Sequence, residues 1–242
     1  MPRLYCDLTL RSDEVIALPA GPARHVQVLR LQPGDVLTLF NGQGGEYDAR
    51  VEHMGRQDVQ VRVGEHHACE REAPTAVHLV VGMPANERMD WLVEKATELG
   101  VQRLSPIMTE RSVLRLHGER ADKKLAHWQS VVVAASEQCG RNRLMQMDPV
   151  RTLSQWLAEF SPPTSAICAV LSLCANATPL GDSLAHHPAG TGWLLVSGPE
   201  GGLSAAEESA LMERGLLPVS LGARVLRAET AAIAAVTRLV LP

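Results

Sequence analysis

Aromatic side chains are scarce in this sequence, which has two tyrosines, two phenylalanines and four tryptophans among 242 residues. The hydrophobic core must therefore be built mainly from leucine, valine, alanine, isoleucine and methionine. A broad aromatic platform on which nucleic-acid bases stack is excluded for the same reason. Hydrophobic residues nevertheless make up 45% of the chain and charged residues 21%, which excludes a fibrous or disordered protein.

Cysteine pairs and metal-binding patterns are also missing. The five cysteines are an odd number and form no CxxC pair, so the sequence predicts reduced thiols and no disulfide framework. The nine histidines include two adjacent pairs, and adjacent residues of an extended chain point apart. We therefore predict that the protein binds no metal.

Long apolar runs are absent too. The N-terminal segment carries charges where a signal peptide needs apolar residues. No stretch reaches the roughly 18 uncharged apolar residues of a membrane span. The sequence thus predicts a soluble, cytoplasmic protein with no membrane partner.

Positive charge is in slight deficit, because 23 lysines and arginines face 27 aspartates and glutamates. A net charge of -4 does not favour nucleic-acid binding by bulk electrostatics. Residues 111–143 nevertheless contain seven basic and three acidic residues, which fits either a solvated helix face or a phosphate-binding patch. Within it, Arg141 and Arg143 follow a predicted helix end, where they either satisfy helix carbonyls or contact a phosphate or a base.

The first 72 residues alternate short β-type runs with turn signals. The run at 58–63 alternates apolar and polar residues with period two, as a half-buried strand does. A short helix is predicted at 25–30. These features predict a small β-barrel or sheet over 1–72, followed by a charged linker at 70–74.

From residue 73 onward, apolar strands alternate with amphipathic helices. Residues 77–81 read as a buried strand, and apolar residues between Met89 and Leu99 share one helical face. A long helix is predicted at 121–139 and an alanine-rich last helix at 229–240. This alternation predicts an α/β domain over 73–242, with a largely parallel sheet covered by helices.

Two strand-to-helix loops of the second domain carry the sharpest local features. Residues 197–204 read SGPEGGLS and lead into a capping box at 204–207, and residues 221–231 read LGARVLRAETA. Ligands of open α/β sheets bind at the carboxyl ends of strands, where such loops meet. We favour a ligand pocket over two alternatives, a plain structural turn in the first loop and helix capping by Arg227 and Glu229 in the second.

Several segments share their order and spacing with one known family. In the second domain they are Lys95–Val101, Thr109–Ser112, Ala135–Arg141, Gly198–Gly202 and Leu221–Thr230, and in the first domain they are His25–Arg30 with Pro33–Asp35. In this pattern the chain resembles the RsmE family, the 16S ribosomal RNA uracil-N3 methyltransferases of the SPOUT class. The resemblance extends over nearly the whole chain.

The resemblance implies a PUA-like β-barrel that helps to hold RNA and a SPOUT-type α/β domain that ends in a trefoil knot. It implies S-adenosyl-L-methionine as the cofactor, a homodimer, and N3 of one uridine in 16S rRNA of the small ribosomal subunit as the target. The implied cofactor-binding residues are Leu171, Gly198, Pro199, Glu200, Gly201, Gly202, Leu221, Gly222, Val225, Leu226 and Arg227. The candidate RNA-binding residues are Arg24, Arg30, Arg111, Lys123, Lys124, Arg141 and Arg143.

The chemistry implied by this resemblance suggests candidate catalytic residues. The uracil ring becomes negative as N3 loses its proton, so a cation near the carbonyl oxygens stabilises the transition state. Arg141 and Arg227 are the candidates for this cation. Glu229 either takes the proton or orients Arg227.

Two segments depart from the family pattern. Ala85 and Asn86 stand where a basic residue is common, which leaves Arg88 as the cation of that segment, and Leu144–Met145 stands where many relatives have Val-Pro. Two other functions stay open. One is a SPOUT methyltransferase that acts on transfer RNA or 23S rRNA, and the other is a non-catalytic RNA-binding factor of ribosome assembly, which binding of S-adenosylmethionine would disfavour.

Overall fold

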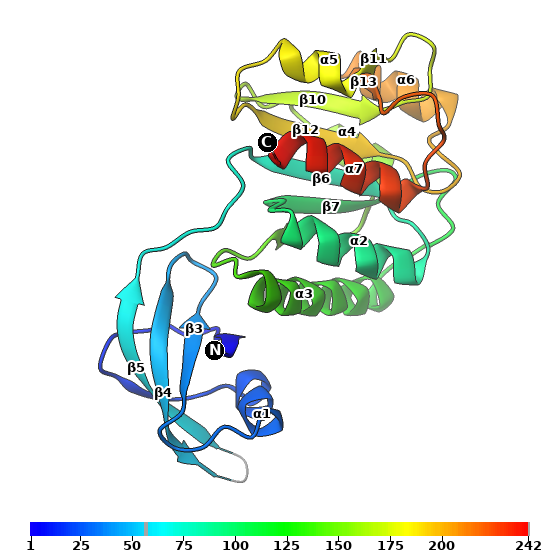
Figure 1. Cartoon of the computed structure of the whole chain (residues 1–242). Helices are drawn as coiled ribbons and strands as arrows, with labels where there is room; N and C mark the ends of the chain where they lie inside the picture. Colours follow the sequence, from blue (N-terminus) through cyan, green and yellow to red (C-terminus); the bar gives the residue numbers. More distant parts are fainter. Residues whose placement is uncertain (56–57, 242) are drawn as a thin grey trace. The chain divides into compact units, whose positions relative to one another are not determined.

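The computed structural model describes residues 1–55 and 58–241, apart from the side chain of Asn86. The chain forms two compact units, whose elements are drawn in Figure 1. Unit 1 consists of Met1–Glu72 and Val133–Leu144, and unit 2 of Ala73–Val132 and Met145–Pro242. The expected boundary after residue 72 assigns the segment 133–144 to the second domain, whereas the structure groups it with unit 1.

Unit 1 is built on a five-stranded sheet with the order β1-β3-β4-β5-β2. Its strands are β1 (Arg3–Tyr5), β2 (Val15–Ala17), β3 (Val36–Phe40), β4 (Glu46–Met54) and β5 (Val59–His67). Strand β1 runs parallel to β3, and the other neighbours are antiparallel. The predicted alternation along β5 is confirmed, because Val59, Val61 and Val63 are fully buried while the residues between them are exposed.

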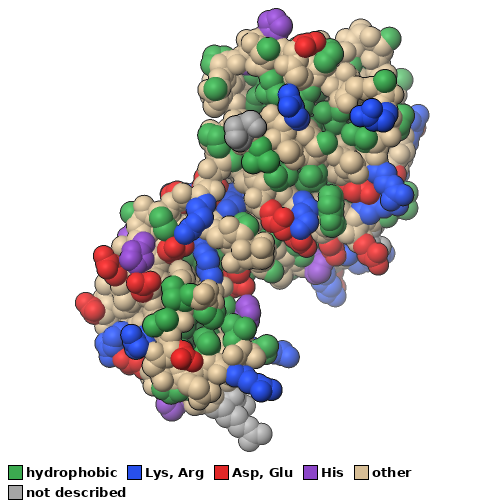
Figure 2. All heavy atoms as spheres, viewed as in Figure 1, with side chains coloured by type: hydrophobic (Ala, Val, Ile, Leu, Met, Phe, Trp, Pro, Cys, Tyr) green, Lys and Arg blue, Asp and Glu red, His purple; other side chains and the backbone are tan. Residues whose placement is uncertain are grey.

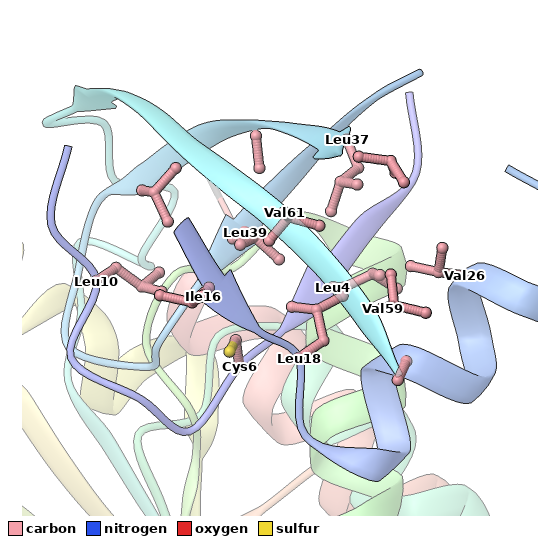
Figure 3. Close-up of a cluster of buried hydrophobic side chains, with 14 residues drawn as sticks. Leu4, Cys6, Leu10, Ile16, Leu18, Val26, Leu37, Leu39, Val59 and Val61 are labelled. Atoms are coloured by element: carbon pink, nitrogen blue, oxygen red, sulfur yellow. The ribbon is translucent and has the colours of Figure 1, made fainter. Parts of the chain in front are cut away.

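The core of unit 1 is aliphatic, as the scarcity of aromatic residues predicts. Side chains from the strands and from α1 (Ala20–Val28) converge on it, among them Leu4, Val26, Leu37 and Val61, which are all 0% exposed (Figure 3). Helix α1 begins at Ala20 and not at residue 25 as predicted. With this earlier start, α1 contains a proline in its first turn. The proline is tolerated there because an N–H group at that position would have no partner within the helix.

Hydrogen bonds within unit 1 explain why the segment 133–144 belongs to it. The Arg3 guanidinium donates to the carbonyl oxygen of Arg141 at 2.8 Å. The backbone N–H of Tyr5 donates to Oε1 of Glu137 at 2.9 Å. These partners lie more than 130 positions apart in the chain, so local sequence patterns could not have indicated them.

Unit 2 contains a parallel sheet with the order β11-β13-β10-β12-β6-β7-β8, in which β9 also pairs with β7. Its strands are β6 (Val77–Gly82), β7 (Arg103–Met108), β8 (Gln146–Met147), β9 (Arg151–Thr152), β10 (Ala166–Leu171), β11 (Thr178–Pro179), β12 (Gly192–Ser197) and β13 (Leu217–Ser220). The central strands are continuous buried runs, as expected for strands covered on both faces.

Helices cover both faces of this sheet. They are α2 (Asn86–Glu98), α4 (Leu153–Glu159), α5 (Leu180–Ala185), α6 (Ala205–Glu213) and α7 (Ala228–Val240). Helix α3 (Glu119–Cys139) begins in unit 2, and its residues from Val133 onward belong to unit 1. Trp156 of α4 and Leu211 of α6 share one core cluster with Leu194 and Val196 of β12. Helices α2 and α7 lie against each other on the opposite face, in front of the sheet in Figure 1. The predicted α/β architecture is thus confirmed.

Local signals placed several helix ends correctly. Gly100 follows α2 with a φ of 88°, a left-handed conformation that glycine adopts readily. Ser204 and Glu207 form the predicted capping box of α6. Within the described residues, no helix is long and apolar enough to cross a membrane.

Candidate ligand pocket of unit 2

A pocket of about 400 Å³ lies where β10, β12 and β13 lead into their following loops. Ten of the eleven residues predicted to bind a cofactor line it. They are Leu171, Gly198, Pro199, Glu200, Gly201, Gly202, Leu221, Gly222, Val225 and Leu226. The structure therefore brings together three loops that are about 25 to 50 positions apart in the sequence.

Close backbone packing shapes the first glycine loop. A Cβ atom on Gly82, at the end of β6, would lie 2.5 Å from Cδ of Pro199, so a larger residue there would displace the loop. Gly202 has a φ of 69°, in the left-handed region that favours glycine. A Cβ on Gly201 would lie 2.9 Å from Cβ of Arg111, so this glycine permits close contact with Arg111 instead of opening space for a ligand.

Arg111 holds the first loop from outside. Its guanidinium donates to the carbonyl oxygen of Gly201 at 3.0 Å and to that of Leu203 at 3.4 Å. The side chain is exposed and also lines the pocket. The sequence alone predicts only an RNA contact for Arg111, because the carbonyl groups that it contacts lie about 90 positions away in the chain.

The second loop leads into helix α7, and residues of both line the pocket. Gly222 has a φ of 102°, and Val225 is 79% exposed at the rim. Ala228 and Ala231, on the first turns of α7, present small side chains to the pocket and leave room for a ligand. The first N–H groups of a helix lack partners within the helix and favour acceptor atoms.

Arg227 occupies a different place from its neighbours in the predicted set. It precedes α7 with an extended backbone, its side chain is exposed, and it is not among the residues that line the pocket. Among the described residues, the ion pair recorded for Glu229 is with Arg88 and not with Arg227. The alternative in which Glu229 orients Arg227 therefore finds no support in the side-chain contacts.

Glu200, Arg88 and Glu229 form a charged cluster beside the pocket. The Arg88 guanidinium donates to Oε1 of Glu200 at 3.2 Å, and its Nε lies 3.7 Å from Oε1 of Glu229. The N–H of Ala85 also donates to Oε1 of Glu200, at 2.9 Å. Glu200 thus ties the start of α2 to the first glycine loop.

Arg141 belongs to unit 1, where it is 2% exposed. Its Nε donates to Oε1 of Glu72 at 3.1 Å and its Nη2 to Oε2 of the same carboxylate at 2.6 Å. Such a bidentate pair fixes both side chains. The structure therefore places Arg141 in the packing of unit 1, and its predicted roles in catalysis and RNA binding would require its release from Glu72.

The other candidate RNA-binding residues are on the surface of their units. Arg24, Arg30, Lys123 and Arg143 are exposed, and Lys124 is half-buried. The Lys123 ammonium lies 3.7 Å from the exposed carboxylate of Glu119. Figure 2 shows acidic and basic side chains interspersed over the viewed face of unit 2.

A second pocket, of about 320 Å³, lies between the sheet and the end of α4. Ser105 donates to Asp148 and pairs with Nε2 of His78 at 2.7 Å, and Nε of Arg103 donates to Asp148 at 2.8 Å. Burial, assisted by the Arg103 charge, lowers the pKa of His78 to about 4. These polar groups are therefore hydrogen-bonded to one another. No group of three metal-binding side chains occurs among the described residues.

Comparisons with known proteins point in one direction. The family model described as "RNA methyltransferase domain" matches residues 71–240, and that of an RNA methyltransferase PUA domain matches 23–64. The chain is 35% identical, over 86% of its length and 79% of the relative, to Ribosomal RNA small subunit methyltransferase E of Mycobacterium bovis.

Among the solved structures that resemble nearly the whole chain are two methyltransferases. One is a Ribosomal RNA small subunit methyltransferase E from Neisseria gonorrhoeae bound to S-adenosyl methionine, with 32% identity, a TM-score of 0.89 and coverage of 99% of this chain and 96% of that one. The other is a methyltransferase from Legionella pneumophila in complex with its cofactor SAM. It has 34% identity, a TM-score of 0.90 and coverage of 98% and 96%.

Proposed function

The chain belongs to the RsmE family of RNA methyltransferases, and from this membership we propose that it methylates 16S rRNA of the small ribosomal subunit with S-adenosyl-L-methionine as the methyl donor. The observation that carries the proposal is the pocket built by the two glycine loops and the loop that follows β10. Its lining contains ten of the residues that the family resemblance implied for the cofactor.

The chemistry of the pocket fits this cofactor. Glu208 and Arg224 are among its lining residues, and a carboxylate favours a cationic group whereas a guanidinium favours a carboxylate. Leu171, Val219 and Leu226 supply apolar surface for a ring. When bound, S-adenosylmethionine supplies an electrophilic methyl carbon on a positively charged sulfur.

We further propose N3 of a uridine as the methyl acceptor. The contribution of the chain is then to align N3 with the methyl carbon, to exclude water and to stabilise the negative charge that develops on the base. Arg227 and Glu229 flank the start of α7 beside the pocket, and Arg141 stays a candidate that must first separate from Glu72. The target base must be unpaired or flipped out, because pairing buries N3 in a duplex.

The assembly and location of the enzyme are part of the same proposal. We infer a homodimer formed through unit 2, for which the support is the exposure of Leu173 and Val225 at the pocket rim, 72% and 79% respectively. We also infer the trefoil knot of the family around the loops 198–202 and 221–227. A ribosomal RNA substrate would place the reaction in the cytoplasm.

The test is methylation of small subunits from cells that lack the endogenous activity. The purified protein is incubated with labelled S-adenosylmethionine and these subunits, and in parallel with large subunits and with transfer RNA, and the modified nucleoside is mapped by mass spectrometry. We expect N3-methyluridine at one site of 16S rRNA. Methylation of transfer RNA or 23S rRNA instead would select the first alternative function, and cofactor binding without transfer to any of these RNAs would contradict the proposal.

A further inference from the structure

Glu229 lacks the partners that a buried carboxylate normally has. The residue is 8% exposed, and no hydrogen-bond partner for its Oε2 atom occurs among the described residues. Its Oε1 atom has the Arg88 ion pair at 3.7 Å, which is longer than a hydrogen bond. A buried carboxylate oxygen without a hydrogen-bond partner is costly, and such an atom calls for a functional explanation.

The surroundings of Glu229 connect it to the cofactor pocket. It follows Ala228, which lines the pocket, and its ion-pair partner Arg88 is hydrogen-bonded to the pocket residue Glu200. Glu200, Arg88 and Glu229 come from three segments that are far apart in the sequence. We refer to them as the Arg88 cluster.

The groups of the Arg88 cluster match the hydrogen-bonding edge of uracil that contains N3. A carboxylate only accepts hydrogen bonds and a guanidinium only donates them. Uracil presents an N3–H donor between two carbonyl acceptors, whereas cytosine presents an acceptor nitrogen at the same position. A carboxylate that faces N3 therefore attracts uracil and repels cytosine.

We propose that Glu229 accepts the N3–H of the target uracil and takes its proton, while Arg88 donates to an adjacent carbonyl oxygen of the same base. This inference rests on the proposed function and assigns to Arg88 the cationic role for which Arg141 and Arg227 were the candidates from sequence. It makes the cluster responsible for the choice of uracil over cytosine, since a site built around an N–H donor strongly rejects a base without it.

The proposed step balances in atoms and charge. The N3–H bond breaks and its proton passes to Oε2 of Glu229, while its electron pair stays on N3. The new N3–C bond forms from that pair, and the electrons of the S–C bond remain on sulfur, which becomes neutral. The guanidinium of Arg88 stabilises the negative charge that collects on the carbonyl oxygen.

Access of a base to Glu229 requires a rearrangement of the side chains around it. Its Oε2 atom is buried, and the 42% exposed side chain of Arg88 lies 3.7 Å from the other carboxylate oxygen, Oε1. Ion pairs of half-exposed side chains are weak, so Arg88 can turn from Glu229 toward the carbonyl oxygen of an incoming base. Its hydrogen bond to Glu200 keeps it next to the pocket.

The experiment compares two methyl acceptors. Small subunits are prepared with ordinary uracil and with 5-fluorouracil, whose N3–H is more acidic and needs less help from a base. The full-length protein, Glu229→Gln, Arg88→Gln and Arg88→Lys are assayed for single-turnover methylation, for S-adenosylmethionine affinity by calorimetry and for melting temperature. Glu87→Gln is the matched control, since Glu87 is an exposed carboxylate in the first turn of α2.

We expect Glu229→Gln to lower the rate on ordinary subunits by about 100-fold or more, which is typical for the loss of a general base. Cofactor affinity should stay within about twofold, and the rate loss should shrink on 5-fluorouracil subunits, since Brønsted behaviour couples the need for a base to the acidity of the proton. Arg88→Gln should lose activity and Arg88→Lys should recover part of it.

Three outcomes would overturn the inference. An active Glu229→Gln variant beside an active wild-type protein would refute it and leave the proposed function intact. An equal loss on both acceptors, or a loss that follows cofactor affinity or melting temperature, would assign Glu229 a structural role. A wild-type protein that binds S-adenosylmethionine but methylates neither acceptor would refute the proposed function, and this inference would fail with it.

Discussion

The Arg141–Glu72 pair determines what a substitution at Arg141 will do. Both side chains are largely buried, with 3% and 17% exposure, and removal of one partner leaves the other charge uncompensated. We expect Arg141→Ala to lower the unfolding free energy by about 3 kcal/mol or more. Urea unfolding of the purified variant measures this change.

The neighbouring arginine is the control for that measurement. Arg143 is 55% exposed and its ion pair with Glu70 is 3.4 Å long, so Arg143→Ala should change stability by less than about 1 kcal/mol. An Arg141→Ala protein with normal stability and strongly reduced methylation would contradict the structural role and support the catalytic one.

His78 makes the stability of unit 2 depend on pH. Desolvation lowers the pKa of its imidazole from 6.5 to about 4, so between these values the unfolded chain takes up a proton that the folded chain excludes. The stability present above pH 6.5 is therefore lost as the pH falls through this window. Between pH 7 and about pH 4.5, the unfolding free energy of the wild type should fall by about 2 kcal/mol more than that of His78→Gln. Urea unfolding at several pH values measures this difference. An unfolding free energy that changes with pH equally in both proteins would contradict the expectation.

Helix α7 offers a direct test of the cofactor pocket. Ala231 lines the pocket and lies within α7, away from the ends of the helix. Leucine is also a good helix former at such a position. We expect Ala231→Leu to fill ligand space and to weaken S-adenosylmethionine binding by about tenfold or more, equivalent to about 1.4 kcal/mol. Calorimetric titration measures the affinity.

Thr230→Leu is the matched control on the same helix turn, because Thr230 is exposed and does not line the pocket. It should bind the cofactor like the wild type. If both variants bound the cofactor normally, the pocket would not be the cofactor site. Gly201→Val is less informative, because its side chain would first displace Arg111.

Elements with strong local signals were predictable from sequence, and features that depend on distant partners were not. The apolar runs, Gly100 and the Ser204 capping box located strands and helix ends because each of these signals acts within a few residues. Helix α1 was placed too late, since the proline near its start reads as a break unless its place in the first turn is known.

The same distinction holds for the candidate site. The glycine loops were recognisable because their composition departs from that of a plain helix or strand. The contact of Arg111 with Gly201 and the pairing of Arg88 with Glu229 were not, because they join segments about 90 and 140 positions apart. The burial of Arg141 depends in the same way on Glu72, 69 positions earlier in the chain.

The charge of the whole molecule bears on RNA binding. A net charge of -4 means that contact with RNA must rely on local basic surface, and Lys123 is 80% exposed there. We expect Lys123→Ala/Lys124→Ala to reduce the slope of log K against log salt concentration for subunit binding by about 1 to 2. Filter binding between low and physiological salt measures the slope.

Glu119→Gln is a suitable control, since it removes the exposed partner of Lys123 and keeps both lysines. The slope of log K against log salt concentration for Glu119→Gln should not be smaller than that of the wild type. A double lysine variant with the wild-type slope would show that this surface is a solvated helix face without a role in RNA contact.

The grouping of 133–144 with unit 1 has a consequence for synthesis and folding. The chain passes from one unit to the other after residues 72, 132 and 144, so unit 1 is discontinuous. A polypeptide emerging from the ribosome cannot complete its first unit until residue 144 has left the exit tunnel, although most of that unit is made first. Until then, the part of unit 1 that residues 133–144 contact stays uncovered on the nascent chain. Chaperone capture or translational pausing at this stage would most affect the yield of folded protein.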